Sequence, residues 1–166
     1  YKNTGAAKIG DITSIGKGQF LMIEQGKQHG EMQNLIYKVD LNGATPIPDN
    51  GDLEYGRLDG KIVPAKKELV LDLRAQGWNI EKAEGLALLP DRKTLAVVND
   101  NDFGMDIDVK DPAVADPEVS DYTYDSDKKA MIYDKDNKVH DVKISLKKNA
   151  PAEQESQIWF FTLPKA

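Results

Sequence analysis

The chain has 166 residues, the length of one compact domain with room for a hydrophobic core. Its apolar share is 40%, and its apolar runs are far shorter than the roughly 18 residues of a membrane span, so no membrane span is predicted. The net charge of −6, without a basic stripe, argues against nucleic acid as a partner. The absence of cysteine excludes disulfides, zinc–thiolate sites and cysteine nucleophiles.

The acidity is confined to one segment. Residues 1–99 contain 13 acidic and 13 basic side chains, whereas residues 100–141 contain 13 acidic side chains and 5 lysines. Cations are therefore the natural partners of this second stretch.

Several short strands are predicted in the first half of the chain. Apolar side chains alternate over 9–15, 35–41 and 69–73, and 20–23 is a short apolar run. Glycines separate the first three segments, as expected for turns. Residues 44–64 are rich in Pro, Gly and Asp and indicate a long loop.

A weak internal repeat organises these strands. "ITSIGKGQFLMIEQG" at 12–26 matches "LALLPDRKTLAVVND" at 86–100, and "NLIYKVDLNGA" at 34–44 matches "SQIWFFTLPKA" at 156–166. Each half therefore predicts three antiparallel strands in the same order, with 69–73 as a fourth strand of the first half. Serial four-stranded sheets are typical of β-propeller blades, so we expect an all-β fold of about two blades. A β-sandwich is the alternative.

An insert at 105–156 interrupts the last blade. It predicts a hairpin in which 130–133 turns through 134–137 into the alternating residues 142–146, while 104–127 is Asp-rich and indicates a surface loop. We expect a single β domain over 1–166. Because propellers close with 4 to 8 blades, we expect this domain to be the C-terminal part of a longer propeller, completed by a companion polypeptide that carries the N-terminal part.

The stretch "EGLALLPDRKTLAVVNDNDFG" at 84–104 resembles a known family. Together with "KKELVLDL", "QFLMIEQG" and "NLIYKVDLNGA", it is similar to the C-terminal portion of the phytase-like proteins, also called the esterase-like activity of phytase family. The resemblance covers most of 9–104 and the strand at 157–163. It implies a propeller, a periplasmic or secreted location, and hydrolysis of phosphate or carboxylate esters. A distant relation to calcium-dependent propeller phytases implies metal assistance.

Oxygen-bearing side chains gather around two of the predicted strand ends. Glu84 begins one strand, and Asn99, Asp100, Asn101 and Asp102 end its neighbour, so all five can face one opening. Carboxylate and amide oxygens are the ligands that Ca²⁺ prefers. We therefore predict Glu84 as a catalytic residue and the other four as calcium ligands. The alternative is a capped turn with solvated carboxylates.

Glu24 occupies nearly the corresponding place in the first repeat. It is predicted as a second catalytic carboxylate, acting as ligand or general base, with a strand-end charge reaching water as the alternative. The sequence contains no EF-hand, phosphate-binding loop or serine nucleophile elbow. The leading hypothesis is a metal-assisted hydrolase acting on a small ester or phosphate. The alternative is a non-catalytic propeller segment that binds a protein or ligand through the insert.

Overall fold

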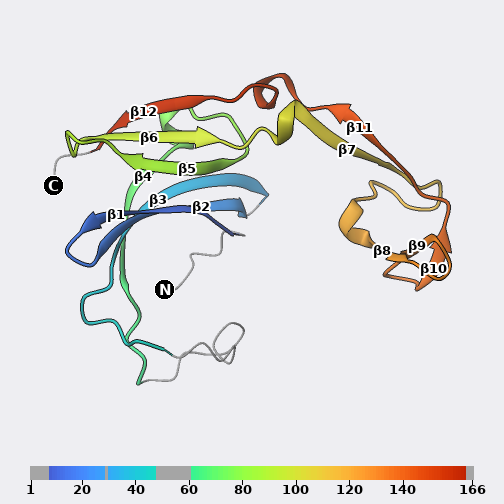
Figure 1. Cartoon of the computed structure of the whole chain (residues 1–166), viewed down its shortest axis with the longest axis horizontal. Coiled ribbons are helices and arrows are strands. Elements are labelled where there is room, and N and C mark those ends of the chain that lie inside the picture. Colours follow the sequence, from blue (N-terminus) through green and yellow to red (C-terminus); the bar gives the residue numbers. More distant parts are fainter. Residues whose placement is uncertain (1–7, 29, 48–60, 164–166) are drawn as a thin grey trace. The chain divides into compact units, whose positions relative to one another are not determined.

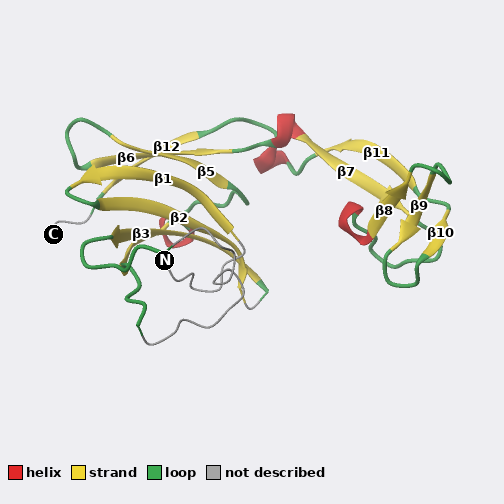
Figure 2. Cartoon of the chain, turned by 60° about the horizontal axis from the view of Figure 1, so that its bottom comes forward, coloured by secondary structure: helices red, strands yellow, loops and turns green. Residues whose placement is uncertain are grey.

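Nearly all regular structure in the protein is β-strand. The computed structural model describes residues 8–28, 30–47 and 61–163, and within these ranges it contains no α-helix. Figure 2 shows strands joined by loops, with only short helical turns between some of them. These 3₁₀ turns are Arg74–Gln76, Asp102–Gly104, Val119–Asp121 and Pro151–Glu153. The expectation of an all-β chain with antiparallel sheets is confirmed.

The chain divides into two compact units. The first comprises Tyr1–Asp100 with Ser156–Ala166, and the second comprises Asn101–Glu155. The second unit occupies nearly the stretch in which the sequence predicts an insert, at 105–156 (Figure 1).

A four-stranded meander forms the first sheet of the first unit. Each strand pairs antiparallel with the next one along the chain. The strands are β1 (Lys8–Gly16), β2 (Gln19–Gln28), β3 (Glu31–Asp40) and β4 (Lys66–Asp72). The predicted fourth strand at 69–73 is thereby confirmed as the neighbour of β3. The predicted loop at 44–64 lies partly outside the described residues.

The second sheet of this unit repeats the same order with three strands. They are β5 (Ala83–Leu88), β6 (Thr94–Asn99) and β12 (Ile158–Thr162), paired antiparallel in the order β12-β6-β5. The predicted repeat is confirmed, since β5, β6 and β12 correspond to β1, β2 and β3. The second unit is inserted between β6 and β12.

The two sheets pack face to face over one hydrophobic core (Figure 1). Trp78 is 1% exposed and meets Trp159 edge-on, with 5.5 Å between the ring centroids. Each fully buried large side chain contributes about 1.5–3 kcal/mol relative to exposure. The buried residues that share this core come from both sheets and from the segment between β4 and β5: Leu21, Ile23, Ile36, Leu73, Trp78, Ile80, Ala83, Leu86, Leu95, Val97 and Phe161.

The contact between β1 and β5 is unusually close. The pairing of β1 with β2 is irregular between Ile9 and Ile12, and Asp11 in this irregular part turns its side chain to β5. Asp11 Oδ2 accepts a hydrogen bond from the Leu86 backbone N–H at 2.7 Å. At Gly10, an added Cβ would lie less than 3.0 Å from the Ala83 carbonyl oxygen. Glycine is therefore required at Gly10 by the approach of another backbone.

The second unit contains two small antiparallel sheets. One pairs β11 with β7, and the other has the order β10-β9-β8. The strands are β7 (Met105–Lys110), β8 (Tyr122–Asp125), β9 (Ala130–Tyr133), β10 (Lys138–His140) and β11 (Lys143–Lys148).

Two sequence predictions for this unit are wrong in part. The partner of β9 is β10, whereas β11, which contains most of the predicted second strand at 142–146, pairs with β7. The predicted surface loop at 104–127 also contains β7 and β8. Alternation reveals that a segment is a strand, but it carries no information on which strand pairs with it.

In the second unit, His140 forms hydrogen bonds with aspartates from two separate segments. His140 Nδ1 lies 2.5 Å from Asp111 Oδ2, and His140 Nε2 lies 3.1 Å from Asp136 Oδ2. The buried Tyr122 hydroxyl donates to the same Asp111 oxygen at 2.8 Å. Hydrogen bonds to Asp136 and then Asp111 raise the pKa of His140 above its usual 6.5. Burial and the Asp111 contact raise the pKa of Tyr122, so its hydroxyl keeps its proton.

No helix in the described ranges combines the length and the apolar character needed to cross a membrane.

Candidate functional site

A cavity of about 300 Å³ lies where β1 begins and β2 ends. Glu81 and Lys82 close one side of it, since they directly precede β5. Its remaining lining residues are Lys8, Gln25, Gly26, Lys27 and Met32. The first sheet therefore supplies most of the walls of the cavity, and the segment that leads into β5 supplies the rest.

Glu84 lies beside this cavity, near the beginning of β5. Its Oε1 accepts a hydrogen bond from Gln25 Nε2 at 2.8 Å and forms an ion pair with Lys8 Nζ. The side chain of Glu84 is 25% exposed, so water can reach the carboxylate. Gln25 is 2% exposed, and its Oε1 accepts from the Ala83 N–H at 3.0 Å. Gln25 thus fixes both the start of β5 and the orientation of Glu84.

Charged side chains surround the cavity. Three lysines line it, Lys8, Lys27 and Lys82, and three carboxylates lie among them, those of Glu81, Glu84 and Asp100. Ammonium groups are strong donors to anionic oxygens. The arrangement therefore places ammonium groups next to a partly exposed carboxylate, that of Glu84.

Glu24 does not join this site. Successive side chains of a strand point to opposite faces, so the contacts of Gln25 with β5 place Glu24 on the other face of the first sheet. There Glu24 is fully buried, and its Oε1 lies 2.6 Å from Lys67 Nζ. Lys67 also lies 4.3 Å above the centre of the Tyr37 ring. The structure therefore separates Glu24 from Glu84, and a joint catalytic role for the two stays a prediction.

The predicted calcium ligands begin at the same end of the second sheet as Glu84. Ala83 of β5 pairs with Asn99 of β6. Asp100 Oδ2 lies 3.8 Å from Nζ of Lys82, which lines the cavity. Asn99, however, closes the β6–β12 ladder, because its Oδ1 accepts from the Gln157 N–H at 2.6 Å and its N–H donates to the Gln157 carbonyl at 3.3 Å.

Asn101 and Asp102 belong to the second unit. Asn101 Nδ2 donates to the Gln154 carbonyl at 3.1 Å. Asp102 begins a 3₁₀ turn with a positive φ of 49°, a conformation that Asp tolerates better than most residues. Hydrogen bonding within their own unit therefore accounts for the Asn101 side chain, and backbone geometry favours an Asp at 102.

Calcium requires 6 to 8 oxygen ligands around one point. Within residues 8–28, 30–47 and 61–163, no three His, Asp or Glu side chains converge in a way that could hold a metal ion. The described carboxylates and imidazoles thus do not by themselves form a calcium site. The assignment of Asn99, Asp100, Asn101 and Asp102 as calcium ligands stays a prediction.

The fold and the site define an all-β protein whose first sheet borders a cavity lined by three lysines. A family model described as phytase-like, esterase-like activity of phytase, matches residues 1–103. The chain therefore belongs to the phytase-like family, as its resemblance at 84–104 predicts. No curated protein and no solved structure matches the chain. Membership of this family suggests an esterase-like hydrolase, and all residues that line the cavity lie within the matched range.

Proposed function

We propose that this chain is part of an esterase-like hydrolase of the phytase-like kind, whose ester-binding site includes the cavity beside Glu84. The main support is a coincidence of two independent findings. The family model covers residues 1–103, and Glu84, a partly exposed carboxylate, contacts two residues that line the cavity, Gln25 and Lys8. The second unit lies almost entirely outside the match.

The proposed chemistry uses groups that the chain itself supplies. Lys8, Lys27 and Lys82 bind the negatively charged part of the substrate, which is a phosphate ester or an ester that carries a carboxylate. Glu84 accepts a proton from the water that attacks the ester phosphorus or carbonyl carbon, and it returns this proton to the alcohol oxygen that leaves as the ester bond breaks. The lysines also stabilise negative charge that develops on the ester oxygens in the transition state. Gln25 holds Glu84 in place while this happens.

The same proposal extends to the architecture. The two packed sheets would be two blades of a propeller, with β1 and β5 as the innermost strands and the cavity at one mouth of the central channel. The repeat of strand order and the contact between β1 and β5 support this assignment. A companion polypeptide would supply further blades, since propellers typically have 4 to 8. A β-sandwich also has two sheets packed face to face, and a native mass equal to one chain alone would favour it.

Hydrolysis of p-nitrophenyl phosphate, which carries the negative charge, tests the site, and hydrolysis of the neutral ester p-nitrophenyl acetate is the comparison. We expect Glu84→Gln to lower kcat/KM by about 100- to 10,000-fold, the usual contribution of a general base. Lys27→Ala should mainly raise KM for the phosphate ester. Glu68→Gln, an exposed β4 residue, is the matched control and should leave both parameters unchanged. Tryptophan fluorescence would establish that each variant is folded. Full activity of folded Glu84→Gln would reject the proposal.

A further inference from the structure

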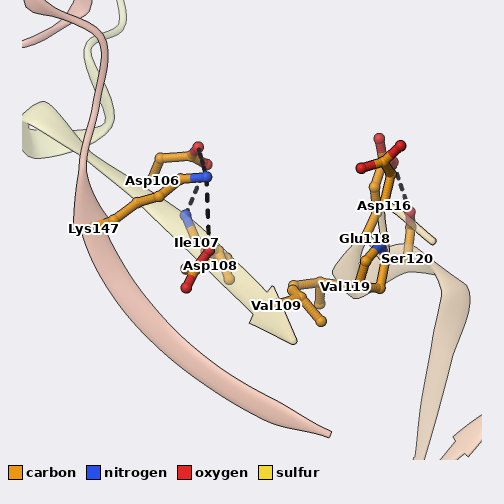
Figure 3. A pocket seen from close by; sticks show the side chains of 10 residues that line it. Asp106, Ile107, Asp108, Val109, Asp116, Glu118, Val119, Ser120 and Lys147 are labelled. Carbon is orange, nitrogen blue, oxygen red and sulfur yellow. Dashed lines mark hydrogen bonds and ion pairs between the residues drawn. The ribbon is translucent and has the colours of Figure 1, made fainter. Parts of the chain in front are cut away.

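A groove of about 680 Å³ lies within the second unit, outside the candidate site. Strand β7 forms one side of it through Asp106–Val109, and the segment Asp116–Ser120 forms the other (Figure 3). We call this cavity the β7 groove. Its lining combines carboxylates with branched apolar side chains.

Strand β7 offers an open edge. In the described part of the chain it pairs with β11 only. The Asn149 N–H donates to the Gly104 carbonyl at 2.9 Å at the end of this ladder, and hydrogen-bonded pairs alternate along an antiparallel ladder. Consequently the backbone N–H and C=O groups of Ile107 and Val109 point away from β11. The Ile107 N–H donates a hydrogen bond to Asp106 Oδ1 at 2.7 Å. This bond satisfies only one of the two N–H groups that point away from β11.

The two faces of β7 differ in chemistry. Asp106 and Asp108 lie on one face, and Ile107 and Val109 lie on the other. On the apolar face, Leu146 of β11 stands opposite Ile107 and is 69% exposed. A two-stranded ribbon with such a face is only marginally stable without something packed against it. This ribbon therefore presents an apolar face next to an open edge.

The side chains of β11, the strand that already pairs with β7, indicate which side chains suit a neighbour of β7. Lys147 of β11 stands opposite Asp106, and its Nζ lies 3.3 Å from the Asp106 carboxylate (Figure 3). Ile144 of β11 stands opposite Val109. One basic residue of β11, Lys147, thus matches both carboxylates of β7, and branched apolar residues match the other face. A strand with the same alternation would complement the open edge.

Charge limits the choice of partner. The groove contains four carboxylates, Asp106, Asp108, Asp116 and Glu118, against one lysine, Lys147. Symmetric antiparallel pairing of β7 with β7 of a second copy about Ile107 would place Asp106 opposite Asp108, which is unfavourable. A positively charged partner is favoured.

We propose that the open edge of β7 binds an extended segment of another protein in which Lys or Arg alternates with branched apolar residues. The segment adds a third strand to the β11-β7 sheet. Its basic side chains lie between Asp106 and Asp116 across the groove, and its apolar side chains extend the face of Ile107 and Val109. Main-chain hydrogen bonds supply affinity, and the alternation supplies specificity.

The test uses the full chain and a fluorescent ten-residue peptide of alternating lysine and valine. A second peptide with the same side chains has its four central residues N-methylated, so that it keeps its charge but loses backbone donors. Asp106→Asn with Asp116→Asn removes one carboxylate from each side of the groove. Asn still accepts the Ile107 N–H and tolerates the positive φ of 46° at residue 116. Asp134→Asn with Asp141→Asn is the control, since both residues are exposed and outside the groove.

We expect saturable binding of the unmodified peptide in fluorescence anisotropy. The N-methylated peptide should bind at least tenfold more weakly. The groove double variant should lose about three- to tenfold in affinity, as expected for two exposed ion pairs, and the control double variant should lose none. Equal binding of both peptides, equal losses in both double variants, or no saturable binding would each overturn the proposal. Self-association of the chain that the groove variant abolishes would also overturn it, by assigning the edge to a second copy.

Discussion

Replacing Gly10 by alanine tests the close packing of β1 on β5, which positions the cavity. The φ angle of Gly10 is not positive, so alanine by itself should stabilise the fold by about 0.4–1 kcal/mol through the unfolded chain. The new Cβ, however, would lie less than 3.0 Å from the Ala83 carbonyl oxygen. This oxygen belongs to backbone that pairs with Asn99, so it cannot yield alone.

The expected cost exceeds the gain. Overpacking costs about 1–3 kcal/mol, and displacement of β1 also stretches the Asp11–Leu86 hydrogen bond, worth about 1 kcal/mol. We therefore expect Gly10→Ala to lower the free energy of unfolding by about 1–3 kcal/mol, which corresponds to roughly 4–12 °C in Tm for a unit of this size. Tryptophan fluorescence is the assay, because Trp78 and Trp159 both lie in the first unit and report on it alone.

Gly85 provides the matched comparison. A Cβ there would meet Cγ2 of Val98, the far end of a side chain that is 38% exposed, rather than backbone. Rotation of Val98 relieves the contact at about 0.5–1.5 kcal/mol, so Gly85→Ala should change stability by less than about 1 kcal/mol. A Gly10→Ala protein with an unchanged or higher Tm would refute the close approach of the two strands.

Three further predictions concern other parts of the chain. Asp136 and Asp111 raise the pKa of His140, so the contribution of His140 to stability is complete below pH 6.5 and is lost as pH rises through the raised pKa. Amide hydrogen exchange of residues 130–140 should therefore accelerate over this pH range by more than the intrinsic pH dependence of exchange. The variant His140→Gln should not show this additional acceleration. Addition of calcium should leave the Tm unchanged. A calcium site would instead add about 2.7 kcal/mol to the free energy of unfolding at a calcium concentration of 100 times Kd. A calcium-dependent rise in Tm that Asp100→Asn abolishes would establish the predicted calcium site. Gln25→Leu should cost about 1–3 kcal/mol in urea denaturation, since it leaves a buried N–H of β5 without its partner, and unchanged stability would contradict the role assigned to this side chain.

The strand order of the first unit could be predicted because it depends on local patterns. Alternating apolar residues and glycine turns mark β1, β2 and β3, and the repeat shows that β5, β6 and β12 follow the same order. Partner choice in the second unit could not be predicted. The residues of β11 alternate clearly, but the pairing of β11 with β7 depends on a contact between segments more than thirty residues apart in sequence.

The candidate site was predicted in part for the same reason. Glu84 was found because it begins a strand next to the Asn99 end of β6. Gln25 was missed, although the burial of Leu21 and Ile23 on the same side of β2 is a signal that Gln25 faces the core and Glu24 does not. The lysines could not be placed, because Lys8 and Lys82 meet only after two sheets have packed.

The rung formed by Asn99 and Gln157 has a consequence for the history of the chain. The second unit departs and re-enters at two residues that are hydrogen-bonded to each other, on strands that neighbour in the sheet at a spacing of about 4.8 Å. A turn of a few residues could bridge the same gap. The second unit can therefore be exchanged for another inserted unit, or lost, while the two sheets of the first unit keep their pairing.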